Sequence, residues 1–280
     1  MPAQTRHTTP NGTPVWTSGR GPTVVLAHGV LMDHRMWASQ VEALSEHYRV
    51  CCFDMWGHGQ APDPPGRRTL EDFVTQVHDV VTTVRGDGQP VLGGFSMGGL
   101  IAQAYAIGHH TELCGLMLLN TVYDRTPQQA ARVRHRYEKN CAIGAENAVE
   151  SARERWFRAA DRAERPAIVE EILGWILDGD FTAKCKAHRV FASTGPEIAG
   201  RLDAISCPAL IMTGEDDDGS TPEMARRMAA EIPDSTTDIV PGQHHMMPVL
   251  DARRANAAIL EFLGRVFGPL AERTRQEQHP

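Results

Sequence analysis

The stretch that decides the fold is Val91-Leu92-Gly93-Gly94-Phe95-Ser96-Met97-Gly98-Gly99-Leu100. It holds the pattern G-x-S-x-G with Ser96 at its centre, after an apolar run typical of a buried strand (91–95) and before a helical pattern (98–109). A serine between a strand and a helix can occupy a tight, strained turn, and the N-terminus of the helix favours developing negative charge. The alternative is a serine that merely joins the two elements. Because both flanking elements are present, we predict that Ser96 is a nucleophile.

A carboxylate is expected further along the chain. A serine hydroxyl is a weak nucleophile without a base, and in proteins with this turn the order is Ser, acid, His. Four acids at 215–218 follow an apolar run at 209–214. They therefore lie at the carboxyl end of a predicted parallel strand, where such sheets place their sites. Spacing alone leaves Asp216, Asp217 and Asp218 as candidates.

The base is expected after the last predicted strand, where His244 and His245 are adjacent, and we prefer His245. Two other histidines, His28 and His58, lie next to glycines in predicted loops and are expected to hold those loops. The others that we considered have no partner motif, and we expect them at the surface or as capping residues: His78, His109, His110 and His188.

The order of the predicted elements indicates an α/β fold with a mostly parallel, doubly wound sheet. Apolar runs without alternation are typical of parallel strands covered on both faces, and helical patterns lie between them. Residues 121–201 break this order, because they are rich in charge and contain helical patterns without a strand. We predict a core formed by 1–120 and 202–268, a helical cap at 121–201 and a flexible tail at 269–280. We assign no role to any single arginine of the cap, because its charges are expected to form a solvated outer face. The predicted strands are 23–27, 48–54, 91–95, 113–120, 209–214 and 237–241.

Composition excludes several classes of function. The 280 residues are 41% hydrophobic and 22% charged, as in ordinary soluble domains, and the net charge of −7 argues against nucleic acid or an anionic membrane as a partner. The N-terminal 20 residues contain no apolar core of a signal peptide, and no run approaches the about 20 apolar residues that a membrane span needs. We expect a cytoplasmic protein.

Cysteine spacing gives no sign of a disulfide framework or a metal site. None of the six cysteines forms a C-x-x-C pair or lies at zinc spacing with histidines, and Cys51, Cys52 and Cys207 lie in or beside apolar runs. The pattern is typical of free thiols in a reducing compartment. We expect neither a metal nor an organic cofactor.

Five motifs, in the order in which they follow along the chain, resemble those of the α/β-hydrolase superfamily, over roughly residues 20 to 265. The branch that looks most similar is that of the 3-oxoadipate enol-lactonases and carboxylesterases. The resemblance implies Ser96, Asp217 and His245 as a catalytic triad, and it is the resemblance that separates Asp217 from its neighbours. It also implies the backbone N–H groups of Val30 and Met97 as an oxyanion hole. The motifs are GFSMGG around Ser96, HGVL at 28–31, DMWGHG at 54–59, the stretch 214–222 and the late His245.

The expected activity is hydrolysis of a small carboxylic ester or lactone through an acyl-enzyme intermediate. Carbon–carbon bond hydrolases, acyltransferases and perhydrolases keep the same serine and remain alternatives, as does a small-ligand receptor without catalysis. Fold and triad do not determine the substrate. The oligomeric state is also open, with a homodimer among the alternatives.

Overall fold

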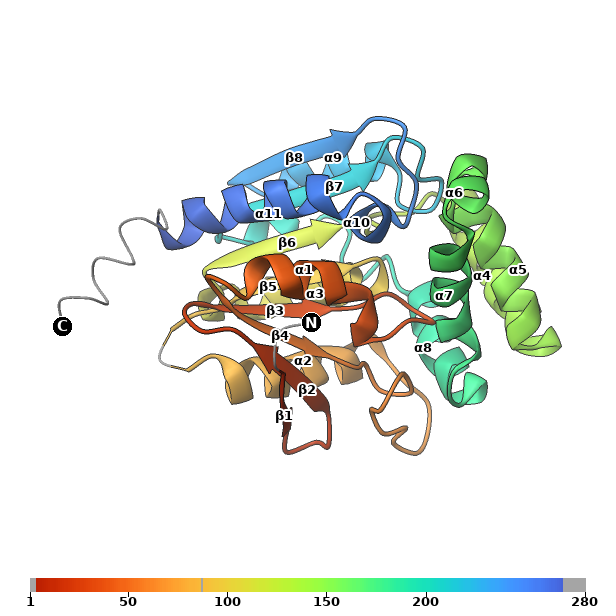
Figure 1. The fold of residues 1–280 in the computed structure, drawn as a ribbon, viewed down its shortest axis with the longest axis horizontal. Helices are drawn as coiled ribbons and strands as arrows, with labels where there is room; N and C mark the ends of the chain where they lie inside the picture. The colour runs from red at the N-terminus through yellow and green to blue at the C-terminus, as the bar shows by residue number, and fades with distance from the viewer. Residues whose placement is uncertain (1–3, 87, 269–280) are drawn as a thin grey trace.

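The computed structural model describes residues 4–86 and 88–268, and an eight-stranded sheet lies at its centre (Figure 1). The strand order is β1-β2-β4-β3-β5-β6-β7-β8, with parallel pairs from β4 to β8 and antiparallel pairs of β1 with β2 and of β2 with β4. The predicted α/β class with a mostly parallel sheet is therefore confirmed. The strands are β1 (Thr5–Thr8), β2 (Pro14–Ser18), β3 (Thr23–Ala27), β4 (Arg49–Phe53), β5 (Val91–Phe95), β6 (Gly115–Leu119), β7 (Ala209–Gly214) and β8 (Ser235–Val240).

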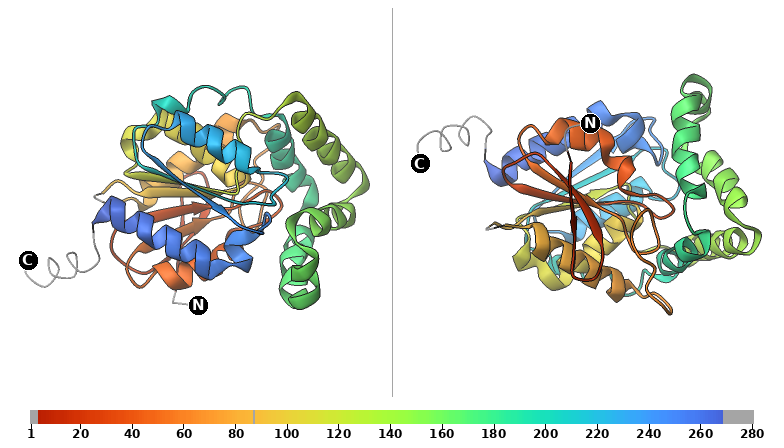
Figure 2. Two further views of the ribbon diagram at one scale, coloured as in Figure 1. Left: turned by 90° about the horizontal axis from the view of Figure 1, so that it is seen from above. Right: turned by 60° about the horizontal axis from the view of Figure 1, so that its bottom comes forward.

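Helices cover both faces of the sheet (Figure 2). Helices α1 and α11 pack together on one face, and α2, α3 and α9 lie on the other. Every residue of β3, β5, β6 and β7 is buried, which explains why these strands are apolar throughout rather than alternating. The helices outside the segment between β6 and β7 are α1 (Ala38–Leu44), α2 (Leu70–Val84), α3 (Met97–His109), α9 (Pro222–Glu231), α10 (Met247–Leu250) and α11 (Ala252–Phe267), with short 3-10 turns η1 (His34–Trp37), η2 (His110–Glu112) and η3 (Leu202–Ala204).

The sequence prediction missed β1 and β2. The β1 residues are polar and mostly exposed, as is common at the edge of a sheet, and β2 begins with a proline. Neither has the apolar run that marked the central strands. Their place is fixed instead by pairing of β2 with β4, from Val15 opposite Phe53 to Ser18 opposite Val50.

Five helices between β6 and β7 lie together beyond the carboxyl ends of the parallel strands (Figure 1). They occupy the part of the chain for which the sequence predicts a cap, and the domain limits at 121 and 201 stay predictions. The tail predicted at 269–280 lies outside the described residues. The helices are α4 (Pro127–Ile143), α5 (Ala145–Trp156), α6 (Ala159–Glu164), α7 (Pro166–Leu177) and α8 (Phe181–Ser193).

One expectation about the cysteines is wrong. Cys141 on α4 and Cys185 on α8 form a disulfide across 44 residues of sequence, with their Cα atoms 5.9 Å apart. Helices α4 and α8 pack against each other, and this packing rather than any local spacing brings the two thiols together. The remaining cysteines are free: Cys51, Cys52, Cys114 and Cys207. Within the described residues, none of the helices has the length and apolar character to cross a bilayer.

Candidate active site

Ser96 lies in a strained turn between β5 and α3. Its φ of 53° and ψ of −112° are unusual for a residue with a side chain, and its N–H donates to Leu119 O at 3.0 Å. The turn is possible only because two glycines flank it. A Cβ on Gly94 would lie 2.3 Å from Gly98 O, and a Cβ on Gly98 would lie 2.3 Å from Ala27 O. The G-x-S-x-G spacing thus follows from the close approach of the turn, the helix and strand β3.

The structure brings the three predicted side chains together. His245 Nε2 lies 3.2 Å from Ser96 Oγ, and His245 Nδ1 lies 2.7 Å from Asp217 Oδ2. All three residues are buried, and they come from the ends of β5 and β7 and the loop after β8. A buried carboxylate on Nδ1 favours the tautomer in which Nε2 is free to accept the proton of a hydroxyl.

Asp217 is the acid at this position because of burial and hydrogen bonding. Asp217 Oδ1 accepts from the N–H groups of Gly219 and Ser220, both at 2.9 Å, while Asp216 and Asp218 are exposed. Burial tends to raise the pKa of Asp217, but the charge and hydrogen bond of His245, with the other donors, outweigh it and hold that pKa below its usual value.

Asn120 is a member of the site that the sequence analysis missed. Its Nδ2 donates to Asp217 Oδ2 at 3.0 Å, and its own backbone has a φ of 45°. Asn120 immediately follows β6, so its place at the carboxyl end of a central strand was the signal that could have found it.

Val30 lies in the loop after β3, beside the serine. A Cβ on the preceding Gly29 would lie 2.8 Å from Phe95 Cδ1, so a side chain at position 29 would push the loop away from the ring that precedes Ser96. Met97 begins α3, where a backbone N–H has no acceptor within the helix. Among the hydrogen bonds of the described residues, none uses the N–H of Val30 or of Met97.

His28 and His58 hold this loop, as the sequence analysis expected. His28 Nδ1 donates to Gly29 O at 2.7 Å, while its Nε2 accepts from Met55 N–H at 2.8 Å. His58 Nε2 accepts from Leu31 N–H at 3.1 Å. Burial lowers the pKa of both imidazoles, so both are neutral and can accept these bonds.

Comparison with known proteins agrees with this geometry. Residues 24–259 match the model of the alpha/beta hydrolase family. The chain belongs to that family. It is 31% identical to the (E)-2-((N-methylformamido)methylene)succinate hydrolase of Acinetobacter baylyi, over 88% of this chain and 91% of the relative.

Other relatives carry related activities. The chain is 24% identical to 3-oxoadipate enol-lactonase 2 of Acinetobacter baylyi, over 80% of this chain and 82% of that enzyme. Among solved structures, an esterase from Thermogutta terrifontis with bound malate has a TM-score of 0.82 and 28% identity, covering 94% of this chain and 99% of the esterase. The enol-lactonase from Burkholderia xenovorans has a TM-score of 0.80 and 25% identity, covering 92% and 99%. The predicted resemblance to α/β hydrolases, including enol-lactonases, is therefore confirmed.

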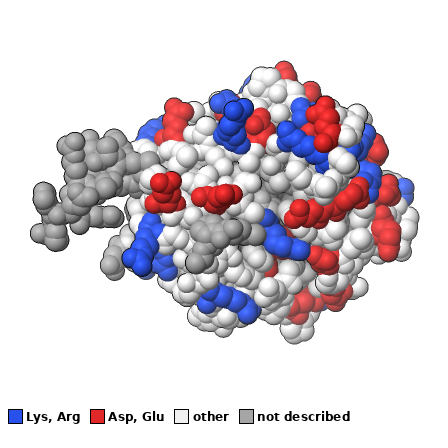
Figure 3. Space-filling view, viewed as in Figure 1, with Lys and Arg blue, Asp and Glu red and all other residues white. Residues whose placement is uncertain are grey.

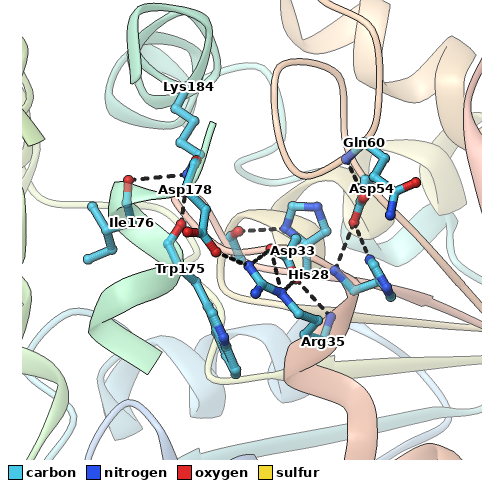
Figure 4. Close-up of polar contacts among 11 residues, drawn as sticks. His28, Asp33, Arg35, Asp54, Gln60, Trp175, Ile176, Asp178 and Lys184 are labelled. Carbon is cyan, nitrogen blue, oxygen red and sulfur yellow. Dashed lines mark hydrogen bonds and ion pairs between the residues drawn. The ribbon is translucent and has the colours of Figure 1, made fainter. Parts of the chain in front are cut away.

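In this alpha/beta hydrolase the loop that carries Val30 is tied through Asp33 and Arg35 to the end of helix α7, which in turn contacts α8 (Figure 4). Arg35 lies between Asp33 and Asp178, with Nη2 2.6 Å from a carboxylate oxygen of each. Lys184 Nζ donates to the carbonyls of Trp175, Ile176 and Asp178, and burial lowers its pKa to about 8. The Lys184 ammonium group thus caps the C-terminal end of α7 by binding its last carbonyl groups.

Two adjoining cavities lie above Ser96. The inner one, of about 30 Å³, is lined by Ser96, Val30 and His245, and the outer one, of about 240 Å³, opens from it beneath α4 and α5. His188 is buried and lines the inner cavity, so the expectation that it is a surface or capping residue is wrong. Both cavities are lined by Arg125, Val133, Arg136, Arg155, Gly219 and His245.

In the described part of the chain, two groups of side chains have the ligand types that metals use, and neither includes Ser96, Asp217 or His245. One is His78, His109 and Glu112, and the other is Asp33, His34 and Asp54. Their atoms already bond within the protein: Glu112 accepts from Tyr105 and His109, and Asp54 accepts from His34.

Proposed function

We propose that this protein is a serine hydrolase that cleaves a small carboxylic ester or lactone through an acyl-enzyme intermediate. The observation that carries the proposal is the continuous contact from Asp217 through His245 to Ser96, at 2.7 Å and 3.2 Å. A second support is the presence of enol-lactonases and an esterase among the relatives.

In the first step His245 Nε2 takes the proton of Ser96 as Oγ attacks the carbonyl carbon. The ring becomes an imidazolium, which the adjacent Asp217 carboxylate stabilises. The tetrahedral oxyanion accepts hydrogen bonds from the N–H groups of Val30 and Met97, which form no other hydrogen bond among the described residues. Loss of one such donor elsewhere costs about 3–4 kcal/mol of transition-state stabilisation.

The tetrahedral intermediate then collapses. The bond from the carbonyl carbon to the leaving alcohol or enol oxygen breaks, His245 gives its proton to that oxygen, and the acyl group stays on Ser96 as an ester. In the second step the acyl group leaves the enzyme. Water, activated by the neutral His245, attacks this ester and releases the acid. These steps use side chains and backbone N–H groups of the protein and water, without a metal or an organic cofactor. A lactone differs only in that its leaving group stays attached to the product.

A second candidate reaction comes from the relative that is 31% identical. Its name describes hydrolysis of a succinate that carries an N-methylformamido-methylene group. The same three side chains would serve such a substrate, and this compound belongs in the substrate panel beside esters and lactones.

The proposal is tested with the purified protein and Ser96→Ala. We expect p-nitrophenyl acetate hydrolysis to fall by about a thousandfold or more in the variant, as triad removal does elsewhere. A fluorophosphonate should phosphonylate the wild type with release of fluoride, giving one adduct by mass spectrometry. Ser193→Ala on α8, an exposed serine, is the matched control and should label like the wild type.

Three outcomes are informative. Equal hydrolysis by wild type and Ser96→Ala would exclude Ser96 as the nucleophile. Labelling of Ser96 without ester turnover would favour one of the other serine-dependent reactions on this fold. No labelling, with tight retention of a small ligand, would favour a receptor.

A further inference from the structure

Arginine side chains around the cavity have unused hydrogen-bond donors. Within residues 4–86 and 88–268, sixteen buried side-chain nitrogen and oxygen atoms have no hydrogen-bond partner. Six of these atoms belong to residues that line the inner cavity with Ser96; one is Ser220 Oγ, and the other five are on arginine and histidine side chains. Buried donors are normally paired, so such a concentration points to a ligand that completes them. The five arginine and histidine atoms are Arg125 Nε and Nη2, Arg136 Nε, Arg155 Nε and His188 Nδ1.

Two other arginines on helices α5 and α6 have carboxylate partners. On α5, Arg153 binds Glu170 at 3.0 Å, while Arg155, two residues further along, has no carboxylate partner in the described part of the chain. Arg162 on α6 binds Glu154 at 3.2 Å. Figure 3 shows basic and acidic residues interspersed on the visible face, without a continuous basic patch. Within the described residues, four of the six buried arginine nitrogens without a hydrogen-bond partner belong to arginines that line the cavity.

Arg125 is held in place for recognition of a planar anion. Its Nη1 donates to Phe191 O at 2.8 Å and to Thr194 O at 3.0 Å, and its guanidinium lies 4.4 Å from the centre of the Phe191 ring. These contacts leave Nε and Nη2, which together form one edge of the guanidinium. Such an edge can bind both oxygens of a carboxylate in parallel.

The charge around the cavity is not balanced by the protein. Burial, and then the charge of Arg136, lower the pKa of Arg125 to about 10 and that of Arg155 to about 9, so both stay cationic at neutral pH. The acids nearest to Arg155 are Asp217, already bonded to His245, and the exposed Asp218. Among the described residues, four arginines, Arg132 of the outer cavity included, thus line the two cavities with only two carboxylates. A ligand with two negative charges would offset the difference.

The neighbouring histidine adds no charge. Burial and the three arginines lower the pKa of His188 to about 3, so its ring is neutral at physiological pH. Its Nδ1 has no partner in the protein. A neutral imidazole can donate to or accept from a polar group of a ligand without adding to the repulsion among the cations.

We propose that the substrate carries two carboxylate groups, and that Arg125, Arg136 and Arg155 bind them next to the carbonyl that Ser96 attacks. The inference rests on the proposed function for the attacking serine, but binding of the dianion does not require turnover. A cavity of about 240 Å³ suits a small aliphatic diacid and its ester or lactone rather than a long acyl chain.

Binding is measured first, by calorimetry on the wild type and on Ser96→Ala. The ligands are the dicarboxylates from malonate to adipate, the monocarboxylates of equal chain length, and inorganic phosphate. We expect at least one dicarboxylate to bind about tenfold or more tightly than its matched monocarboxylate, in both proteins. If no dicarboxylate exceeds its monocarboxylate, or if phosphate binds most tightly, the proposal is wrong. Ser96→Ala lacks the nucleophile but keeps the arginines. Dicarboxylate binding by this variant therefore tests the present proposal even if the hydrolase proposal fails.

Variants then identify the residues. Arg136→Gln should weaken the favoured dicarboxylate by about tenfold or more, since a hydrogen bond to a charged group is lost, and Arg136→Lys should recover part of the loss. Arg134→Gln is the matched control, because Arg134 is exposed on the same helix. Circular dichroism checks that each variant is folded. Equal dicarboxylate affinities for Arg136→Gln and Arg134→Gln would overturn the assignment.

Discussion

The side-chain amide of Asn120 donates to Asp217 Oδ2 at 3.0 Å, the same oxygen that accepts from His245 Nδ1 at 2.7 Å. Asn120 itself is held by its backbone N–H, which donates to Met212 O at 2.7 Å. A residue at the end of β6 therefore fixes the Asp217 carboxylate, which follows the neighbouring strand β7. We conclude that Asn120 is a positioning residue for the acid.

Removal of this amide should weaken catalysis more than substrate binding. We expect Asn120→Ala to lower kcat by about tenfold, the value of one hydrogen bond to a charged group, with little change in KM. The φ of 45° makes alanine strained there, so Asn120→Gly provides a variant without that strain. Steady-state kinetics of both variants against the substrate of the wild type is the measurement. A change in KM alone would contradict the role.

A second prediction concerns the turn around the serine. Gly98→Ala places a Cβ 2.3 Å from Ala27 O, so the helix and β3 must separate, and we expect destabilisation by about 1–3 kcal/mol with loss of activity. Gly108→Ala on the same helix is the matched control, because the space around Gly108 is open. Alanine should stabilise α3 there by up to about 1 kcal/mol. Urea unfolding of the two variants measures both effects, and equal effects would show that the close approach is not needed.

A third prediction concerns the disulfide between α4 and α8. Cross-linking residues 44 apart restricts the unfolded chain, so Cys141→Ser should lower the free energy of unfolding by about 2–4 kcal/mol. Thiol titration of the denatured wild type should find four free thiols without reductant and six with it. Six thiols in both conditions would show that the bond does not form. Cys114→Ser, which alters a free and partly exposed cysteine, is the matched control.

The sheet and the serine turn could be predicted from the sequence because their determinants are local. Strand β5, Ser96 and helix α3 are consecutive, and the glycines around Ser96 meet backbone atoms that are always nearby when this turn forms. The choice of Asp217 was different. Its spacing equals that of its neighbours within one residue, so in the sequence only the family resemblance separated it. In the structure, burial and the bonds to Oδ1 and Oδ2 distinguish it.

The cavity above the serine could not be predicted because it depends on how helices α4 to α8 pack. Arg155 and Arg153 are two residues apart on one helix and have the same chemistry in the sequence, yet one faces the cavity and the other faces Glu170. His188 lacks a partner motif because its neighbours, Arg125 and Arg136 among them, come from distant positions in the chain. The pair Cys141 and Cys185 was missed for the same reason.

The burial of His188 has a consequence for stability that can be measured. Its pKa is about 3 in the folded protein, below the ordinary value of 6.5, because burial and three arginines disfavour the imidazolium. Between these two values the unfolded chain binds a proton that the folded chain does not. The wild type should therefore lose stability as the pH falls from 6.5 toward 3, by up to about 1.4 kcal/mol per pH unit from this residue.

His188→Gln removes the group that binds this proton in the unfolded chain. The free energy of unfolding of the variant should therefore fall less steeply than that of the wild type between pH 6.5 and 4.5. Urea unfolding at several pH values measures the two slopes, and other titrating groups cancel in their difference. His135→Gln, which alters an exposed histidine on α4, is the matched control. Equal slopes for His188→Gln and the wild type would mean that His188 takes up its proton in the folded state. The three arginines would then not be close enough to exclude it, and the cavity would not hold the concentrated positive charge that the dicarboxylate proposal requires.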